Sequence, residues 1–241
     1  YLYAITDAVE HPVCKDVGVD GAAVYAIPQG SVAAVVSDIS KKRIRPERKN
    51  LVVHNAIVKK LMEETAVLPA AFGTIAENPM ALRKIMKDNS ETFVEQLKLV
   101  RGKVEMGLRV AWDVPNIFEY IVNYHYELAV LRDEMAGAQR SPSRADKIEL
   151  GRRFDRLLGQ DRERLTEEVL EVLDPYCVDI IQNEPREERE VMHLACLVDR
   201  DAQKRFEDGI FEAAKLFDNN FSFDFNGPWA PYNFVDIALD V

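Results

Sequence analysis

The segments Val67-Leu68-Pro69-Ala70-Ala71-Phe72-Gly73-Thr74 and Lys103-Val104-Glu105-Met106-Gly107-Leu108-Arg109-Val110 decide the fold. The first is an apolar run that ends at a glycine and predicts a strand. Pro69 indicates an edge or bulge position in that strand, because proline cannot donate a hydrogen bond to the ladder. The second segment predicts a half-buried strand, since its apolar residues recur at every second position. These residues are Val104, Met106, Leu108 and Val110.

Two short helices are predicted between these strands. Asn78 followed by Pro79 is a helix start, because asparagine accepts hydrogen bonds from unpaired amides and proline fits the first turn. A second start lies at Ser90, and Gly102 ends that helix. We therefore expect a strand, two helices and a second strand, with both strands in the same sheet.

The segment before Val67 adds three more strands and a helix to this unit. Tyr1–Thr6 is a predicted strand, and residues 22–27 and 32–36 predict a hairpin across Pro28-Gln29-Gly30-Ser31. A helix follows, with its buried stripe at Leu51, His54, Ile57, Val58, Leu61 and Met62. The order resembles a ferredoxin-like α+β sandwich with helices on one face of an antiparallel sheet.

From Val114 the pattern becomes helical. Apolar residues from Ile117 to Met135 recur at heptad spacing and predict one helix that packs along another. Gly137 and residues 139–143 indicate a turn, and a second helix is expected over about residues 144–173. We interpret the pair as a long antiparallel helical hairpin that joins two lobes.

The last part of the chain predicts a smaller α+β lobe. Strands are expected over residues 177–181, 191–198 and 221–225, with a helix over about 201–217 before the last strand. The fold class is therefore α+β with two lobes. The expected division is a ferredoxin-like domain over 1–113, a helical hairpin connector over 114–174, and a C-terminal α+β lobe with an aromatic tail over 175–241.

Composition limits the possible partners. The 241-residue chain has a net charge of -10, which argues against general affinity for nucleic acid or lipid membranes. Residues 1–113 carry 16 basic and 14 acidic side chains, whereas 114–241 carry 15 and 27. The three cysteines favour a reducing compartment over a disulfide framework. Because the chain begins at Tyr1 without a methionine, we expect that a few leading residues were trimmed.

No motif predicts catalysis or a cofactor. His11-x-x-Cys14 and His193-x-x-Cys196 resemble fragments of a metal site, but no second pair completes a set of four ligands. The sequence holds no glycine-rich phosphate loop, nucleophile elbow or His-Glu-x-x-His helix. We therefore expect no catalytic, cofactor-binding or metal-binding residues, and interpret adjacent acidic pairs as solvated surface.

Three regions are candidates for contact with a partner. The basic run Lys41–Lys49 presents Arg45 and Arg48, although a solvated connection before a helix is the simpler interpretation. The strand edge at Leu68, Pro69 and Phe72 could accept another chain by strand addition. The tail concentrates Trp229, Tyr232 and Phe234 between and after two prolines; it forms either a docking surface or a cover that folds back over the second lobe.

His54 follows Asn50 by one helical turn. Its side chain could bind a ligand, but a hydrogen-bonded histidine on a half-buried face is the more common arrangement.

The chain resembles the gas vesicle protein F/L family (GvpL/GvpF). The resemblance runs in order from the first strand, at Tyr3-Ala4-Ile5, to the tail, and departs modestly at Met106 and Ala230. The matching stretches are Arg45-Pro46…Asn50-Leu51…His54, Leu68–Thr74, Gly102–Val110 and Gly227–Val235.

The resemblance implies a non-enzymatic minor structural or accessory protein of gas vesicles within the cytoplasm, needed for vesicle nucleation. Its implied partners are the major gas vesicle shell protein and other gas vesicle accessory proteins. The alternative is a small-molecule-binding or enzymatic ferredoxin-like protein with its site between the lobes.

Overall fold

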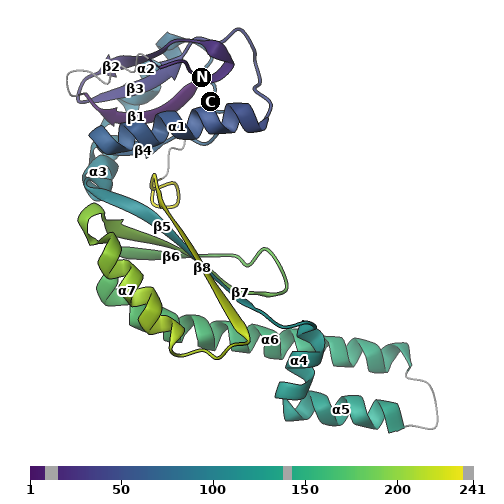
Figure 1. Ribbon diagram of the computed structural model, residues 1–241. Helices are drawn as coiled ribbons and strands as arrows, with labels where there is room; N and C mark the ends of the chain where they lie inside the picture. Colours follow the sequence, from purple (N-terminus) through teal and green to yellow (C-terminus); the bar gives the residue numbers. More distant parts are fainter. Residues whose placement is uncertain (9–15, 138–142, 236–241) are drawn as a thin grey trace. The chain divides into compact units, whose positions relative to one another are not determined.

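The structure, a computed structural model, describes residues 1–8, 16–137 and 143–235 (Figure 1). The chain forms two compact units, each discontinuous in sequence. The first unit contains Tyr1–Met106, Leu197–Arg200 and the chain from Gly227 onward, and the second contains Gly107–Cys196 and Asp201–Asn226. Among the described residues the strands form two four-stranded sheets, which confirms the α+β class.

The first sheet has the order β2-β3-β1-β4 and all its pairings are antiparallel. The predicted hairpin is confirmed: Gln29 pairs with Val32, and Gly30 adopts a φ of 61° in the tight turn. β4 pairs only with β1, so Pro69 lies on an edge strand as expected. These strands are β1 (Leu2–Asp7), β2 (Val24–Gln29), β3 (Val32–Ser37) and β4 (Val67–Pro69).

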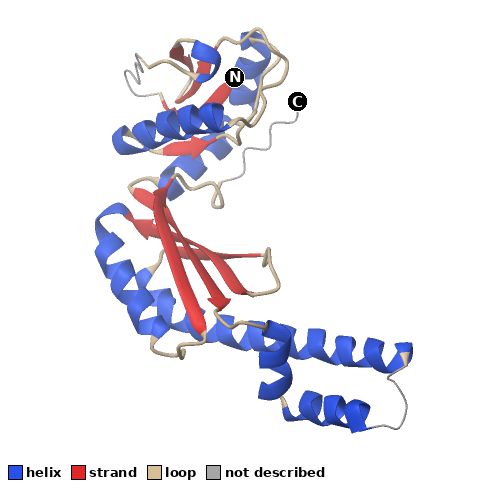
Figure 2. Cartoon of the chain, turned by 45° about the vertical axis from the view of Figure 1, so that its right-hand side comes forward, coloured by secondary structure: helices blue, strands red, loops and turns tan. Residues whose placement is uncertain are grey.

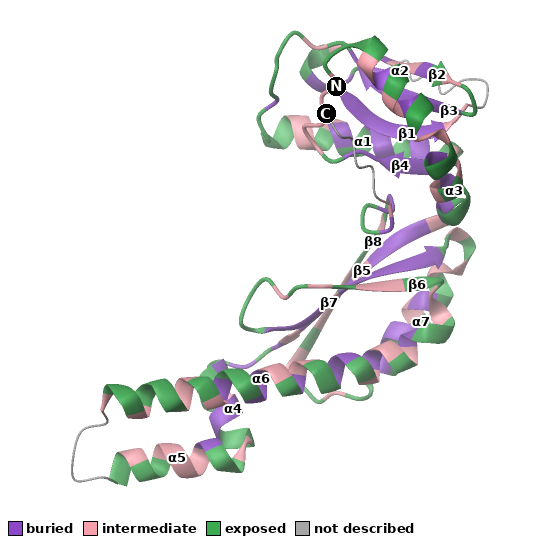
Figure 3. Ribbon diagram, turned by 180° about the vertical axis from the view of Figure 1, so that it is seen from behind, coloured by how far each residue is buried: buried purple, intermediate pink, exposed green. Residues whose placement is uncertain are grey.

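Helices cover both faces of this sheet, so the expectation of helices on one face is wrong. The helix α1 (Arg48–Glu64) packs on one face, where the His54 ring stacks on Tyr3 at 5.7 Å. The pair α2 (Pro79–Asp88) and α3 (Ser90–Val100) packs on the opposite face, against Leu2, Val32, Ala34, Val36 and Leu68 (Figure 3). All residues of β3 are buried, as expected for a strand covered on both sides.

The ferredoxin-like designation stays a prediction. Between β1 and β2, the described residues contain the short 3₁₀ helix η1 (Val19–Gly21) where a ferredoxin-like fold has an α-helix. The expected domain boundaries at 113 and 174 likewise stay a prediction.

The strand β5 (Lys103–Trp112) does not join β4 in one sheet, so that expectation is wrong. It is an inner strand of the second sheet, whose order is β6-β7-β5-β8. The predicted alternation is confirmed, because Val104, Met106, Leu108 and Val110 are all buried. Alternation identifies which face of a strand is buried but not which strand lies beside it, and this explains the wrong assignment.

The second sheet is completed by three strands that follow the helical part of the chain. β6 (Asp179–Asn183) begins two residues later than expected, and β7 (Glu190–Asp199) agrees with the prediction. β8 (Phe221–Trp229) continues past the predicted strand into the aromatic tail. The short 3₁₀ helices η2 (Asp174–Tyr176) and η3 (Arg200–Ala202) precede β6 and α7 (Gln203–Ala214).

The long helix α6 (Arg144–Leu173) confirms the second helix of the predicted pair. It begins with a capping box in which the Ser143 side chain accepts from the Asp146 backbone and Asp146 accepts from Ser143. Helix α5 (Tyr126–Gly137) packs along it, and Arg156 bridges to Glu127 at 2.8 Å (Figure 2). No helix among the described residues is both long and apolar enough to span a membrane.

The first helix of that pair is split, contrary to the prediction of one helix from Ile117 to Met135. Helix α4 (Ile117–Tyr124) ends at His125, whose backbone is extended (φ -98°, ψ 112°), and α5 starts at the next residue. The His125 ring lies 2.7 Å from Asp161 of α6, which accounts for the break. Tyr124, at a predicted buried heptad position, is 61 % exposed.

Two helical glycines of the second unit allow a matched test of packing. A Cβ atom at Gly159 of α6 would meet nothing within 4 Å, whereas at Gly209 of α7 it would lie 2.7 Å from the Tyr176 ring. We expect Gly159→Ala to raise the free energy of unfolding by up to about 1 kcal/mol. We expect Gly209→Ala to lower it by about 1–3 kcal/mol, because the ring must move.

Urea unfolding followed by far-UV circular dichroism measures both changes. A Gly209→Ala protein at least as stable as the Gly159→Ala protein would contradict the close packing of Tyr176.

Candidate partner-binding site

The tail segment, defined as Gly227–Val235, packs into the first unit. Ala230 and Phe234 are buried, with 4 % and 8 % of their surface exposed, whereas Trp229 is 49 % exposed. The tail therefore folds back onto the protein. It lies against the first unit, whereas the sequence alone predicts that a folded-back tail covers the second lobe. Its buried residues anchor the segment and leave Trp229 partly in solvent.

An aromatic cluster, made of Tyr1, Tyr3, His54, Phe72 and Tyr232, holds the tail to α1. His54 is only 1 % exposed and lies between two hydroxyl groups. Its Nδ1 is 2.9 Å from the Tyr1 hydroxyl and its Nε2 is 3.2 Å from the Tyr232 hydroxyl. A neutral imidazole has one donor and one acceptor, and hydroxyl groups on both sides satisfy either tautomer. The predicted hydrogen-bonded histidine is thereby confirmed.

Burial keeps this histidine uncharged. Removal from water lowers the pKa of His54 to about 4, although a hydrogen bond with the Ala70 backbone opposes the shift. Burial also raises the pKa of Tyr1 to about 12 and raises the pKa of Tyr232. The cluster is therefore neutral near pH 7 and acts as a polar anchor.

Glu105 forms the second anchor of the tail. Its carboxylate is 7 % exposed and accepts hydrogen bonds from the backbone nitrogen and the side-chain amide of Asn233, at 2.8 and 2.7 Å. Burial raises the pKa of Glu105, and the two bonds from Asn233 oppose that shift. The sequence places Glu105 on the wet face of β5 beside Lys103 and Arg109, so alternation alone could not identify it as a site residue.

One exposed stripe of α1 continues onto the tail. Arg48, Val52, Asn55 and Lys59 follow at helical spacing and are all exposed, Val52 to 58 %. Asn55 and Lys59, together with Met62, Pro228 and Trp229, line an apolar cavity of about 130 Å³ between α1 and the tail. The α1–tail surface, defined by Arg48, Val52, Asn55, Lys59 and Trp229, is thus one continuous patch.

The other predicted contact residues differ in accessibility. Leu68 and Pro69 are buried, and Phe72 is half-buried with its ring 5.7 Å from that of His54. The Ala70 backbone N–H donates to the Tyr3 carbonyl, so alternate residues of β4 bond to β1. The backbone nitrogen of Pro69 therefore faces the open edge, where it has no hydrogen to donate. Strand addition at this edge therefore has few donors to use. Arg45, like Arg48, is exposed.

The basic run is partly neutralised by its neighbours. Lys41 pairs with Asp20 at 2.6 Å, and Lys49 pairs with Glu47 at 3.0 Å. Both pairs are exposed and contribute little to stability. Arg45 and Arg48 thus add to the positive charge at the start of α1.

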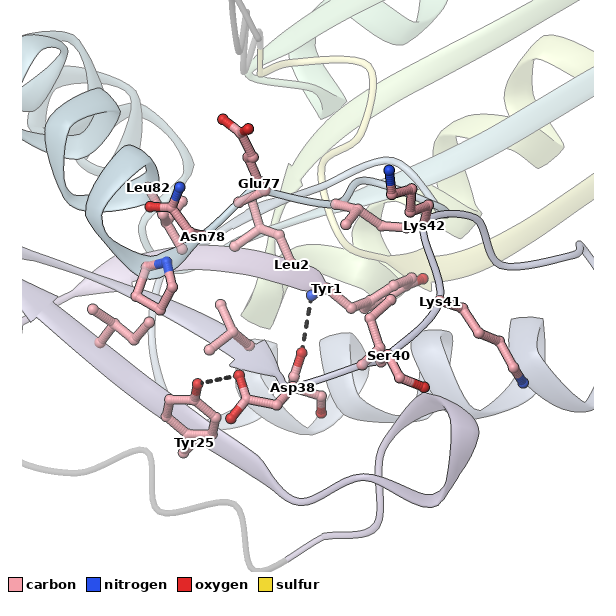
Figure 4. A pocket seen from close by; sticks show the side chains of 17 residues that line it. Tyr1, Leu2, Tyr25, Asp38, Ser40, Lys41, Lys42, Glu77, Asn78 and Leu82 are labelled. Atoms are coloured by element: carbon pink, nitrogen blue, oxygen red, sulfur yellow. Dashed lines mark hydrogen bonds between the residues drawn. The ribbon is translucent and has the colours of Figure 1, made fainter.

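A cavity of about 500 Å³ lies within the first unit, between the end of β3 and the start of α2 (Figure 4). Its floor is apolar and includes Leu2, Ile27 and Leu82. Tyr25 donates to Asp38 at 2.7 Å on one wall. The lining carboxylates and lysines balance: they are Asp38, Glu77, Lys41 and Lys42.

No group of three or more His, Cys, Asp or Glu side chains among the described residues is placed to hold a metal ion. His193 is half-buried in β7 and Cys196 is fully buried. His11 and Cys14 lie outside the described residues, as does most of the predicted turn at 139–143.

The fold and this geometry define a two-unit α+β protein with a docked tail. The family described as "Gas vesicle synthesis protein GvpL/GvpF" matches residues 1–236, so the chain belongs to this family. The resemblance found in the sequence is confirmed, and the protein is related to gas vesicles.

Curated relatives match along nearly their whole length. Gas vesicle protein F of Streptomyces sp. (strain CB03234) is 25 % identical, with 98 % of this chain and 99 % of the relative covered. Gas vesicle protein F of Nostoc sp. (strain PCC 7120 / SAG 25.82 / UTEX 2576) is 22 % identical, with 99 % and 98 % covered.

Solved structures share the fold. The crystal structure of the gas vesicle protein GvpF from Anabaena sp. PCC7120 gives a TM-score of 0.84 at 21 % identity, covering 99 % of this chain and 98 % of that one. GvpF from Microcystis aeruginosa gives 0.81 at 18 % identity, with 97 % of each chain covered.

The buried His54 makes stability depend on pH. The pKa of His54 is lower in the folded protein than the ordinary value of 6.5, so the unfolded chain binds a proton first as the pH falls. The contribution of His54 to the free energy of unfolding is therefore fully present above pH 6.5 and is lost as the pH falls towards 4. Between these values we expect the free energy of unfolding to fall by up to about 1.4 kcal/mol per pH unit from this residue alone. The His54→Gln variant should lack this component.

NMR titration of the His54 ring measures the pKa directly, and the missing signal in His54→Gln assigns it. A ring that titrates near pH 6.5 would show that the cluster opens easily to water.

Proposed function

We propose that this protein is a non-enzymatic accessory protein of gas vesicle assembly. In this proposal it acts at nucleation, binds the major gas vesicle shell protein and other accessory proteins, and resides with the vesicle in the cytoplasm. The observation that carries the proposal is the match over residues 1–236 to a family described by gas vesicle synthesis.

A physical need supports such a role. Subunits that assemble through exposed apolar strands aggregate unless they are covered or brought together in order. A helper for this task needs a rigid surface with large side chains, and its own net charge of -10 keeps it soluble during the process. The same charge disfavours nucleic acid and anionic lipid as partners.

The α1–tail surface is our candidate for that contact. Tryptophan, tyrosine and arginine are the residues most often found at the energetic centre of interfaces. Trp229 and Tyr232 are 49 % and 37 % exposed and are held by the buried anchors of the tail. Arg45 and Arg48 extend the surface with positive charge. Phe234, Leu68 and Pro69 are buried, so their role in this proposal is to support the surface from below.

Gene deletion in a vesicle-forming strain tests the function, and complementation tests the surface. We expect the deletion to abolish or deform vesicles and the wild-type gene to restore them. We expect Trp229→Ala and Val52→Glu to restore them poorly, because loss of a central interface residue costs about 2 kcal/mol or more of binding free energy.

The matched control is Phe211→Ala, since Phe211 of α7 is a comparably exposed ring at 55 % but lies in the second unit. Circular dichroism must show that each variant folds. Normal vesicles in the deletion strain would overturn the assembly role. Full restoration of vesicles by both surface variants would contradict the proposed contact site but leave the assembly role intact.

The alternative, a small-molecule or enzymatic site, has one observation in its favour. The cavity of about 500 Å³ falls in the range of roughly 300–1,000 Å³ typical of ligand pockets. That cavity lies within the first unit, whereas the alternative placed the site between the lobes. A nucleotide or metabolite retained through purification, identified by mass spectrometry, would favour this second function.

A further inference from the structure

A second cavity, within the second unit, has a different chemistry. Its volume is about 210 Å³, below the range of roughly 300–1,000 Å³ for small-molecule sites and suited to a single side chain. Helices α4 and α6, strands β5 and β8 and the turn that follows α7 build it. Its aromatic walls are Trp112, Tyr120, Tyr124, Phe217 and Phe221.

The aromatic walls are held in place by one another. Tyr120 and Tyr124 stack at 6.1 Å with an interplanar angle of 16°, and Phe217 meets Phe221 edge-on at 4.9 Å. Trp112 is 2 % exposed, whereas Tyr124 is 61 % exposed. The guanidinium of Arg162 already lies over the buried Trp112 ring, 5.8 Å from its centroid, so Tyr124 is the ring that an entering group can contact most openly.

Three carboxylates and one guanidinium also line the cavity. Asp161 is fixed by the His125 ring at 2.7 Å, and Asp218 accepts from the backbone and side chain of Asn220 at 2.9 and 3.0 Å. Arg164 pairs with Glu168 at 2.9 Å and lies 3.7 Å from Asp161. Among the side chains that line the cavity, one positive charge therefore stands against three negative ones, and a second guanidinium, that of Arg162, lies over Trp112.

The surroundings strengthen this negative field. Burial raises the pKa of the Tyr120 hydroxyl, and Asp218, Tyr124 and Asp161 raise it further, so this hydroxyl stays neutral among the carboxylates. Residues 114–241 carry 15 basic and 27 acidic side chains, so the field of the whole half of the chain favours a cation. An apolar side chain would fill the space but leave the excess negative charge of the lining unbalanced, although each carboxylate already has a partner within the chain.

We propose that this cavity receives an arginine side chain from a partner protein. Ring faces attract cations, and arginine does so most often because its flat guanidinium stacks on them. The same group can donate to Glu168 or Asp218 while it stacks. The two requirements, aromatic walls and excess carboxylate, are met by the same side chain.

This inference goes beyond the proposed function and uses none of the residues of the α1–tail surface. It adds a second contact point, in the second unit, and names the side chain that fits it. Failure of one proposal therefore leaves the other standing.

The test is an NMR titration of the full chain that follows the indole N–H signal of Trp112, with Trp229→Phe to separate the two tryptophans. The probes are the peptide acetyl-Gly-Arg-Gly-amide and its citrulline analogue, which keeps the shape but lacks the charge. We expect a saturable shift with the arginine peptide and binding weaker by roughly tenfold with citrulline.

Variants locate the binding. Tyr124→Ala removes the exposed ring, and Glu168→Gln removes one charge; each should weaken binding by about two- to fivefold. Glu171→Gln, an exposed residue one turn further along α6, is the matched control and should have no effect. Equal shifts with both peptides, or no shift at millimolar concentration, would overturn the proposal, as would an equal loss in Glu171→Gln.

Discussion

The tail supplies hydrogen-bond partners to two buried polar side chains, His54 and Glu105. Glu105 accepts both of its bonds from Asn233, and one ring nitrogen of His54 faces Tyr232. A buried carboxylate without partners costs several kcal/mol, so the tail must be in place whenever this part of the first unit is folded. This requirement joins β1, α1, β5 and the tail into one cooperative set.

The same requirement explains why the tail can present large side chains to solvent. An isolated segment with two prolines and three aromatic rings would sample many conformations and lose entropy on binding. Anchored at Tyr232 and Asn233, it holds Trp229 beside α1 in advance. The rigid support and the exposed ring are two results of one set of buried contacts.

Local patterns in the sequence predict most of the elements but not their partners. The hairpin at Gly30, the buried stripe of α1 and the long helix α6 all follow from turn chemistry and periodicity, which act over a few residues. The sheet assignment of β5 depends on β7 and β8, which begin 78 and 109 residues after β5 ends. The break at His125 depends on Asp161 across the helix pair. Neither contact leaves a periodic signal.

The candidate site shows the same limit. Arg45, Arg48 and Trp229 could be selected because charge and aromatic content are visible in the sequence. Glu105 could not, because it lies on the polar face of an alternating strand, and its partner Asn233 is distant in sequence. Leu68 and Pro69 illustrate the reverse: the edge strand is real, but both side chains are buried.

The discontinuity of the first unit has a consequence for biosynthesis. Its sheet is complete in sequence by Pro69, yet its last anchors lie at Tyr232 and Asn233 and leave the ribosome more than 160 residues later. Because domains fold as the chain emerges, the N-terminal part must wait in an unfinished state, in which Glu105 lacks Asn233 and His54 lacks Tyr232. A chain interrupted before the tail would never form the α1–tail surface, so only full-length molecules would present it.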